Sequence, residues 1–124
     1  MLRSLLFGCA LLASGAVFAA SPSPAARAEV DYLFAYLDKS GCEFFRNGEW
    51  HGAADARTHL QRKYDGLVKA GQIATAEDFI AKGATESSAS GKPYQVRCSG
   101  RPAVPSAQWL NDELQRYRQT KGKT

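Results

Sequence analysis

Cysteine and histidine are scarce in this sequence, which limits the metal sites that it can build. The 124 residues include three cysteines and two histidines. A structural zinc site takes four cysteine or histidine ligands, arranged as closely spaced pairs. Cys42 and Cys98 have no histidine at that spacing. We therefore predict neither a metal ion nor a cofactor.

Beyond residue 20 the sequence also lacks a long apolar run, internal repeats and a concentrated basic patch. The formal net charge is +4, and the lysines and arginines are spread along the chain apart from a cluster in residues 116–123. A nucleic-acid-binding surface gathers its basic residues on one face or along one helix. We interpret the cluster as serving the dipole of a final helix and solubility, and we expect no nucleic acid as a partner.

The N-terminus does carry an apolar run. Residues 5–17 are almost unbroken apolar sequence after Arg3, and Val17 and Ala19 place small residues at the spacing of a signal-peptide cleavage site. A membrane anchor is the alternative, but the run is shorter than the roughly 20 residues that cross a bilayer. Lipid attachment at Cys9 is disfavoured by the short segment before it. We predict a signal peptide over residues 1–20, export to the periplasm and no stable membrane insertion after cleavage.

Cleavage leaves Cys42 and Cys98 as an even pair of cysteines in an oxidising compartment. We therefore predict a disulfide between them. The alternative is two reduced thiols in the core. In the chain-entropy treatment, a bridge across a loop of this length contributes about 4 kcal/mol to stability.

Apolar periodicity and turn signals predict an α+β fold. We divide the mature chain into a linker over residues 21–27, a single compact globular domain over residues 28–119 and a basic tail over residues 120–124. About four helices are expected to pack on a small antiparallel sheet made of a hairpin and one further strand. The signals are apolar spacing up to residue 39 and over residues 53–69, a capping box at 75–78, a serine cap at 106, an Asn-Gly turn at 47–48 and alternation over 94–98.

Four short stretches carry a family resemblance. They are FFRNG at residues 44–48, His59 and Leu60 with Lys63, TAEDFI at residues 75–80, and SS followed by SGKPY within residues 87–94. In this order they resemble the YfeK-like family of small exported bacterial proteins, a domain of unknown function. The resemblance implies a periplasmic protein of Gram-negative bacteria and brings no activity with it. The disulfide is not a requirement of the family and still depends on the compartment.

His59 is the main candidate for chemistry. It lies within the helix expected over residues 53–69, with Asp55 four residues before it and Lys63 four residues after it. A general-base role is one interpretation. The other is a half-buried helix histidine that bonds to Asp55 or to a neighbouring strand. Arg46, beside the hairpin turn, is either a ligand contact or a residue that fixes the turn by pairing with an acid.

The polar loop at residues 87–93 offers hydroxyls and a lysine. It has no Gly-x-Ser-x-Gly elbow for a serine nucleophile, and Pro93 stands where a phosphate-binding loop has its hydroxyl residue. The loop either holds an anion or a glycan hydroxyl, through Lys92 and backbone amides, or only connects its neighbours. Glu43 and Glu49 suggest a glycosidase pair, but solvated charges on a hairpin explain them more simply.

No complete set of catalytic residues emerges, so we predict a non-catalytic binding or interaction module. Its ligand is an envelope glycan, an anion or a periplasmic protein. The residues that we expect it to touch are Arg46, His59, Lys63, Ser88, Lys92 and Tyr94. The alternative is a cell-envelope hydrolase with His59 as base and a loop serine or carboxylate as partner. A lysozyme inhibitor is disfavoured because the positive charge would repel a basic target.

Overall fold

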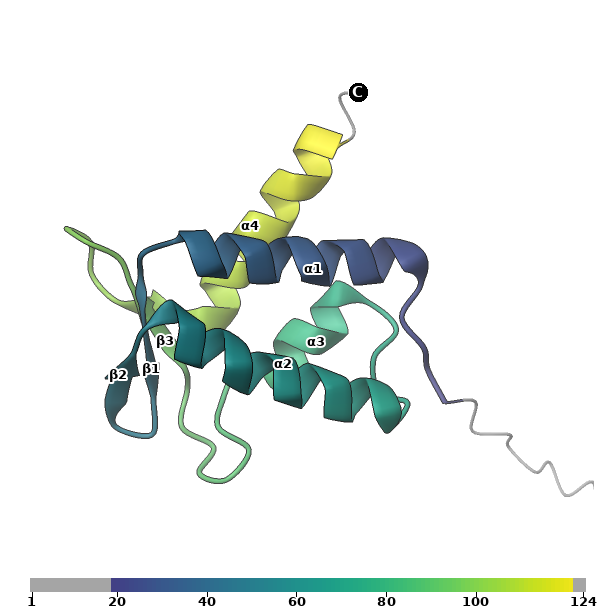
Figure 1. Cartoon of the computed structure of the whole chain (residues 1–124), viewed down its shortest axis with the longest axis horizontal. Coiled ribbons are helices and arrows are strands. Elements are labelled where there is room, and N and C mark those ends of the chain that lie inside the picture. Colours follow the sequence, from purple (N-terminus) through teal and green to yellow (C-terminus); the bar gives the residue numbers. More distant parts are fainter. Residues whose placement is uncertain (1–18, 122–124) are drawn as a thin grey trace, which may run out of the picture.

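The computed structural model describes residues 19–121 (Figure 1). Apart from Ala19 and Ala20, the predicted signal peptide lies outside these residues, as do the last three residues of the predicted basic tail. The elements, in chain order, are α1 (Pro24–Lys39), β1 (Glu43–Arg46), β2 (Glu49–His51), α2 (Ala53–Lys69), α3 (Ala76–Gly83), β3 (Gln95–Arg97), β4 (Val104–Pro105) and α4 (Ser106–Lys121). None of the described helices is both long and apolar enough to cross a membrane.

The predicted α+β class is confirmed. The four strands form one antiparallel sheet in the order β2-β1-β3-β4. Helices α1 and α2 lie side by side, α4 crosses α1, and the sheet stands at the end where α1 finishes and α2 starts (Figure 1). A shared core fills the space between these elements, and its most deeply buried large side chains are Leu33, Leu37, Ile73, Phe79, Ile80, Leu110 and Leu114.

The hairpin of β1 and β2 has the predicted two-residue turn. Asn47 and Gly48 both have positive φ angles, 51° and 84°, as a type I′ turn requires. This turn pairs Phe44 with His51. Because side chains alternate between the two faces of a strand, Phe44, Arg46 and His51 share the face toward the helices.

The structure differs from the sequence prediction at two places. Helix α1 begins at Pro24, inside the stretch predicted as a linker, because the Ser23 hydroxyl accepts from the Ala26 amide at 3.1 Å and proline fits the first helical position. A fourth strand, β4, joins the sheet in addition to the predicted three, with Val104 paired to Val96. Its proline is tolerated because β4 is an edge strand.

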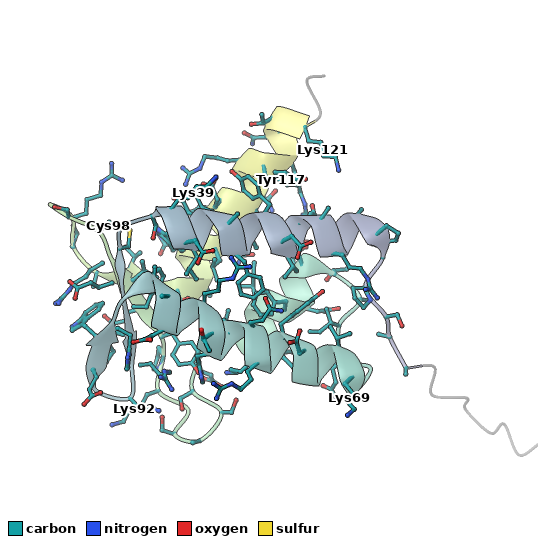
Figure 2. The ribbon with its side chains drawn as sticks, viewed as in Figure 1. Lys39, Lys69, Lys92, Cys98, Tyr117 and Lys121 are labelled. Carbon is teal, nitrogen blue, oxygen red and sulfur yellow. A yellow bond between two sulfur atoms is a disulfide. The ribbon has the colours of Figure 1, made fainter. Side chains whose placement is uncertain are left out.

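Two long-range links join the elements. The predicted disulfide between Cys42 and Cys98 is present and connects the chain just before β1 to the chain just after β3 (Figure 2). Arg118 of α4 donates to Glu29 of α1 and to Glu77 of α3, each at a shortest distance of 2.6 Å. One guanidinium therefore holds three helices together.

Candidate functional site

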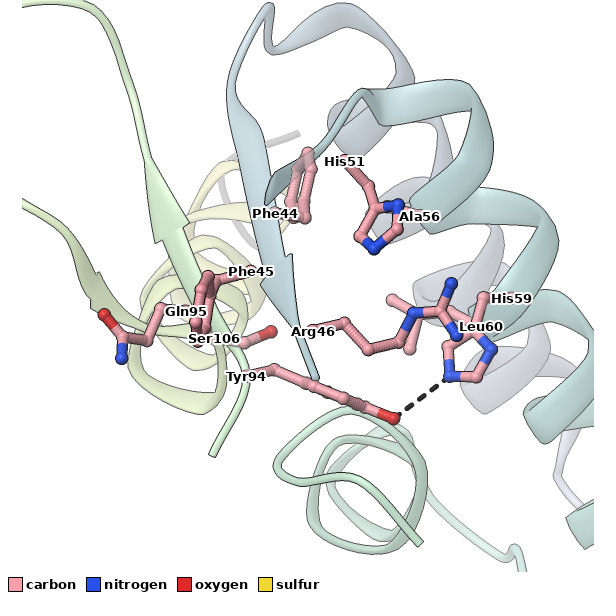
Figure 3. Close-up of a pocket in the computed structure, with 10 residues that line it drawn as sticks. All are labelled: Phe44, Phe45, Arg46, His51, Ala56, His59, Leu60, Tyr94, Gln95 and Ser106. Atoms are coloured by element: carbon pink, nitrogen blue, oxygen red, sulfur yellow. Dashed lines mark hydrogen bonds between the residues drawn. The ribbon is translucent and has the colours of Figure 1, made fainter. Parts of the chain in front are cut away.

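A small pocket lies between α2 and the face of the sheet that points toward the helices (Figure 3). Its cavity volume is about 30 Å³, which is room for one or two water molecules. The pocket is lined by Phe44, Phe45, Arg46, His51, Ala56, His59, Leu60, Tyr94, Gln95 and Ser106. Three of the six predicted binding residues, Arg46, His59 and Tyr94, therefore meet here.

Arg46 supplies the positive charge of the pocket. It is half-buried at the end of β1, and its side chain points from the sheet toward α2 (Figure 3). The ion pairs within residues 19–121 use Arg57, Arg97, Arg116 and Arg118, and none of them includes Arg46. The expected ion pair of Arg46 with an acid is therefore absent from the described residues, although Glu49 lies opposite Arg46 in the hairpin.

Tyr94 connects His59 to Lys63. The Tyr94 hydroxyl lies 3.0 Å from Nε2 of His59 and 3.2 Å from Nζ of Lys63. An ammonium group can only donate, so the tyrosine oxygen accepts from Lys63 and its proton is free to be donated to His59. Lys63 also donates to the carbonyl oxygen of Glu86 at 3.1 Å. His59 is thus a half-buried helix histidine whose partner is not Asp55 but Tyr94, which lies immediately before β3.

Burial and nearby positive charge shift the protonation of these groups. Burial, followed by the charges of Arg46 and Lys63, lowers the pKa of His59 from 6.5 to about 4. Burial also lowers the pKa of Lys63, against the raising effect of Glu86. The pKa of Tyr94 is raised by burial. At neutral pH the pocket therefore contains a neutral imidazole and a neutral phenol beside one fixed guanidinium charge.

The other predicted contacts lie outside this pocket. Lys63 does not line the pocket and is connected to it by its hydrogen bond to Tyr94. Ser88 and Lys92 are exposed on the loop that precedes Tyr94, and Figure 2 labels Lys92 there. The Ser90 hydroxyl donates to Oδ1 of Asn47 at 3.1 Å, which holds the loop against the hairpin turn. Ser88 and Lys92 stay predictions, as contacts for a ligand that extends beyond the pocket.

Seven lining residues were not among the predicted contacts: Phe44, Phe45, His51, Ala56, Leu60, Gln95 and Ser106. The sequence did contain a signal that could have placed His51 in the pocket. A two-residue turn at Asn47 and Gly48 pairs residue 51 with residue 44, so both side chains lie on the same face of the hairpin. No local signal could place Ser106, whose amide donates to the carbonyl oxygen of Tyr94 at 2.9 Å.

A second hollow, of about 290 Å³, lies between α1, α4 and the segment from β3 to β4. Tyr36 and Trp109 form its aromatic part, with ring centroids 4.8 Å apart. Two arginines line it: Arg116 donates to Glu113 at 2.8 Å, and Arg101 is exposed and takes part in none of the ion pairs within residues 19–121. The pocket at Arg46 is smaller, but its arginine is half-buried and lies beside His59 and Tyr94, whereas Arg101 is exposed. Among the described residues, no group of three or more histidine, cysteine, aspartate or glutamate side chains is arranged to hold a metal ion.

These features define a small α+β domain with one disulfide and an arginine-bearing pocket between a helix and the sheet. The chain belongs to the DUF5329 family, a family of unknown function, whose model matches residues 24–118. It is also similar to the uncharacterized protein YfeK of Salmonella typhimurium strain LT2, with 42% identity over 62 residues. The matched region covers 50% of this chain and 50% of that relative, so the chain spans about half the length of the curated protein that it matches. No solved structure matches the chain.

Proposed function

We propose that this protein is a non-catalytic binding module of the periplasm, and that its pocket takes a small anionic group through Arg46. The observation that carries the proposal is a half-buried guanidinium that forms no ion pair within residues 19–121, although Glu49 is its cross-strand neighbour. A charge taken out of water is costly unless it is paired. A bound anion would supply the missing pair.

The walls of the pocket favour such an anion. Phe44 and Leu60 are 7% and 6% exposed, so they exclude water from one side of Arg46. An ion pair is stronger where water is excluded, because the effective dielectric constant is lower. Neutral His59 adds no positive charge of its own, which leaves the guanidinium as the anchor.

The hydrogen bonds of His59 support binding over hydrolysis. A general base must reach the proton that it removes, but Nε2 of His59 faces the Tyr94 hydroxyl at 3.0 Å. The serines of the loop do not line the pocket. Ser87 is buried and its carbonyl oxygen accepts from the Gly91 amide at 2.8 Å, which is a role in loop structure.

The periplasmic part of the proposal depends on the disulfide together with the predicted signal peptide. Disulfides such as Cys42–Cys98 persist in oxidising compartments and are rare in the cytosol. A periplasmic module would meet envelope glycans and other anions, and the exposed Ser88 and Lys92 would contact the parts of such a ligand that remain outside the pocket.

Titration of the protein with acetate and with inorganic phosphate, followed by amide chemical shifts, tests this function. We expect saturable shifts at residues that line the pocket, and we expect Arg46→Gln to weaken anion binding at least tenfold because the ion pair is lost. Arg97→Gln is the matched control, because Arg97 is exposed on the outer face of the sheet beside Glu43. Equal binding by the Arg46→Gln variant and the parent protein would refute the proposal.

A further inference from the structure

We infer that the group bound at Arg46 is a carboxylate on a carbon that carries one methyl-sized substituent, as in a C-terminal alanine residue or in lactate. This inference rests on the proposed function and specifies its ligand. It follows from three properties of the pocket: its charge, its volume and the nature of its walls.

The charge of the pocket matches a monoanion. Arg46 is the one arginine or lysine that lines it, and the lowered pKa of His59 keeps that imidazole neutral at pH 7. The ammonium group of Lys63 already donates to Tyr94 and to the Glu86 carbonyl, and the side chain of Glu86 offsets part of its charge. One guanidinium pairs with one carboxylate through two parallel hydrogen bonds. A doubly charged phosphate group would call for a second free cation.

The volume limits what can accompany the carboxylate. A cavity of about 30 Å³ corresponds to roughly one methyl group or one to two water molecules, so it takes the substituent alone, and the carboxylate stays at the mouth, where Arg46 is half-buried. The space exists because residue 56, on the inward stripe of α2, is an alanine that is itself 8% exposed. A larger side chain at this position would fill the cavity.

The walls require that this substituent be apolar. Phe44, Ala56 and Leu60 are all buried members of the main core cluster, and a polar group placed against them would lose its hydrogen bonds to water. A methyl group buried there gains roughly fourfold in affinity, the equivalent of about 0.8 kcal/mol for each buried carbon. We therefore assign the substituent that lies against these three side chains as a methyl group.

Three N-acetylated amino acids test the inference by the same chemical-shift titration. We expect N-acetylalanine to bind about fourfold more tightly than N-acetylglycine, since it buries one more methyl group. N-acetylvaline should bind more weakly than N-acetylalanine, because its branched side chain exceeds the cavity. Ala56→Val should remove the preference for alanine over glycine and keep the dependence on Arg46, which a merely unfolded variant could not do.

The outcomes separate the inference from the proposed function. If all three compounds bind equally and Arg46→Gln still abolishes binding, the inference is wrong and the anion-binding function stands. If Arg46→Gln changes nothing for any anion, both are wrong. Propionate and lactate distinguish the source of the carboxylate: tighter binding of N-acetylalanine than of these acids assigns a peptide terminus, and the reverse order assigns a free short-chain acid.

Discussion

At the scale of single residues, the pocket depends on a histidine that the fold keeps uncharged. His59 is half-buried and lies near the charges of Arg46 and Lys63, and both effects disfavour an imidazolium. The Tyr94 hydroxyl then has an acceptor on the imidazole ring. If His59 became protonated, this acceptor would be lost and a second positive charge would stand beside Arg46.

The lowered pKa of His59 predicts a pH dependence of stability. The unfolded chain takes up the proton near pH 6.5, whereas the folded protein takes it up near pH 4. Between these values the unfolded state binds more protons, so the free energy of unfolding falls as the pH is lowered through this window. We expect His59 to account for about 1–2 kcal/mol of this loss, since partial exposure of the ring reduces the full effect.

Urea denaturation at pH 7 and at pH 4.5 measures this contribution. Protonation of Glu77 and Asp78 also lowers the free energy of unfolding on acidification, because Arg118 and backbone amides, respectively, lower the pKa values of these carboxyl groups. The contribution of His59 is therefore obtained by comparing the pH profile of a His59 variant with that of the parent protein. His59→Gln should flatten the profile over this window relative to the parent protein. An imidazole of His59 that titrates near pH 6.5 by NMR would contradict the prediction.

At the scale of elements, the hairpin turn sets the position of Arg46. The turn residues Asn47 and Gly48 take positive φ angles, and the two-residue connection pairs Arg46 with Glu49 at the end of the ladder. A change in the turn would shift this register, and with it the face on which the guanidinium lies.

Substitution of two glycines, each with room for a Cβ atom, provides a matched test of the backbone conformation of the turn. Nothing lies within 4 Å of a Cβ at Gly48 or at Gly66, but only Gly48 has a positive φ, of 84°. We expect Gly48→Ala to cost about 1 kcal/mol through backbone strain, and Gly66→Ala in α2 to gain about 0.5–1 kcal/mol through helix propensity. Chemical denaturation measures both values, and shifts of the same sign would show that the turn does not impose this constraint.

Several elements could be predicted because their signals are local. The capping box at Thr75 and Asp78 forms with two bonds of 3.1 Å, and the helix predicted over residues 53–69 has these bounds in the structure. Strand β4 could not be predicted, because its two residues are ordered by pairing with β3. The contact of His59 with Tyr94 joins residues 35 positions apart, so only the folded arrangement of α2 and the loop reveals it.

At the scale of the whole molecule, the disulfide closes a loop of the chain that contains nearly all the residues lining the pocket. Cys42 and Cys98 are 56 positions apart, and the chain between them carries every lining residue except Ser106. The bridge therefore restrains the hairpin, α2 and the segment at Tyr94 together. A disulfide over a loop of this length contributes about 4 kcal/mol in the chain-entropy treatment.

Intact mass of the protein from a periplasmic extract tests export and the bridge together. We expect a mass that lacks the first 19 or 20 residues, with two thiols alkylated only after reduction. Reduction should also lower the melting temperature, and the double variant Cys42→Ala with Cys98→Ala should melt at the lower temperature whether or not reductant is present. An uncleaved chain, or thiols that react without reduction, would contradict the periplasmic assignment.

The central claim is that Arg46 is the anchor of an anion site, and a crystal structure of the protein grown with N-acetylalanine tests it most directly. We predict that the carboxylate accepts two hydrogen bonds from the Arg46 guanidinium and that the methyl group lies against Phe44, Ala56 and Leu60. A carboxylate found instead in the hollow beside Trp109 and Arg116, with the Arg46 pocket unoccupied, would contradict the claim.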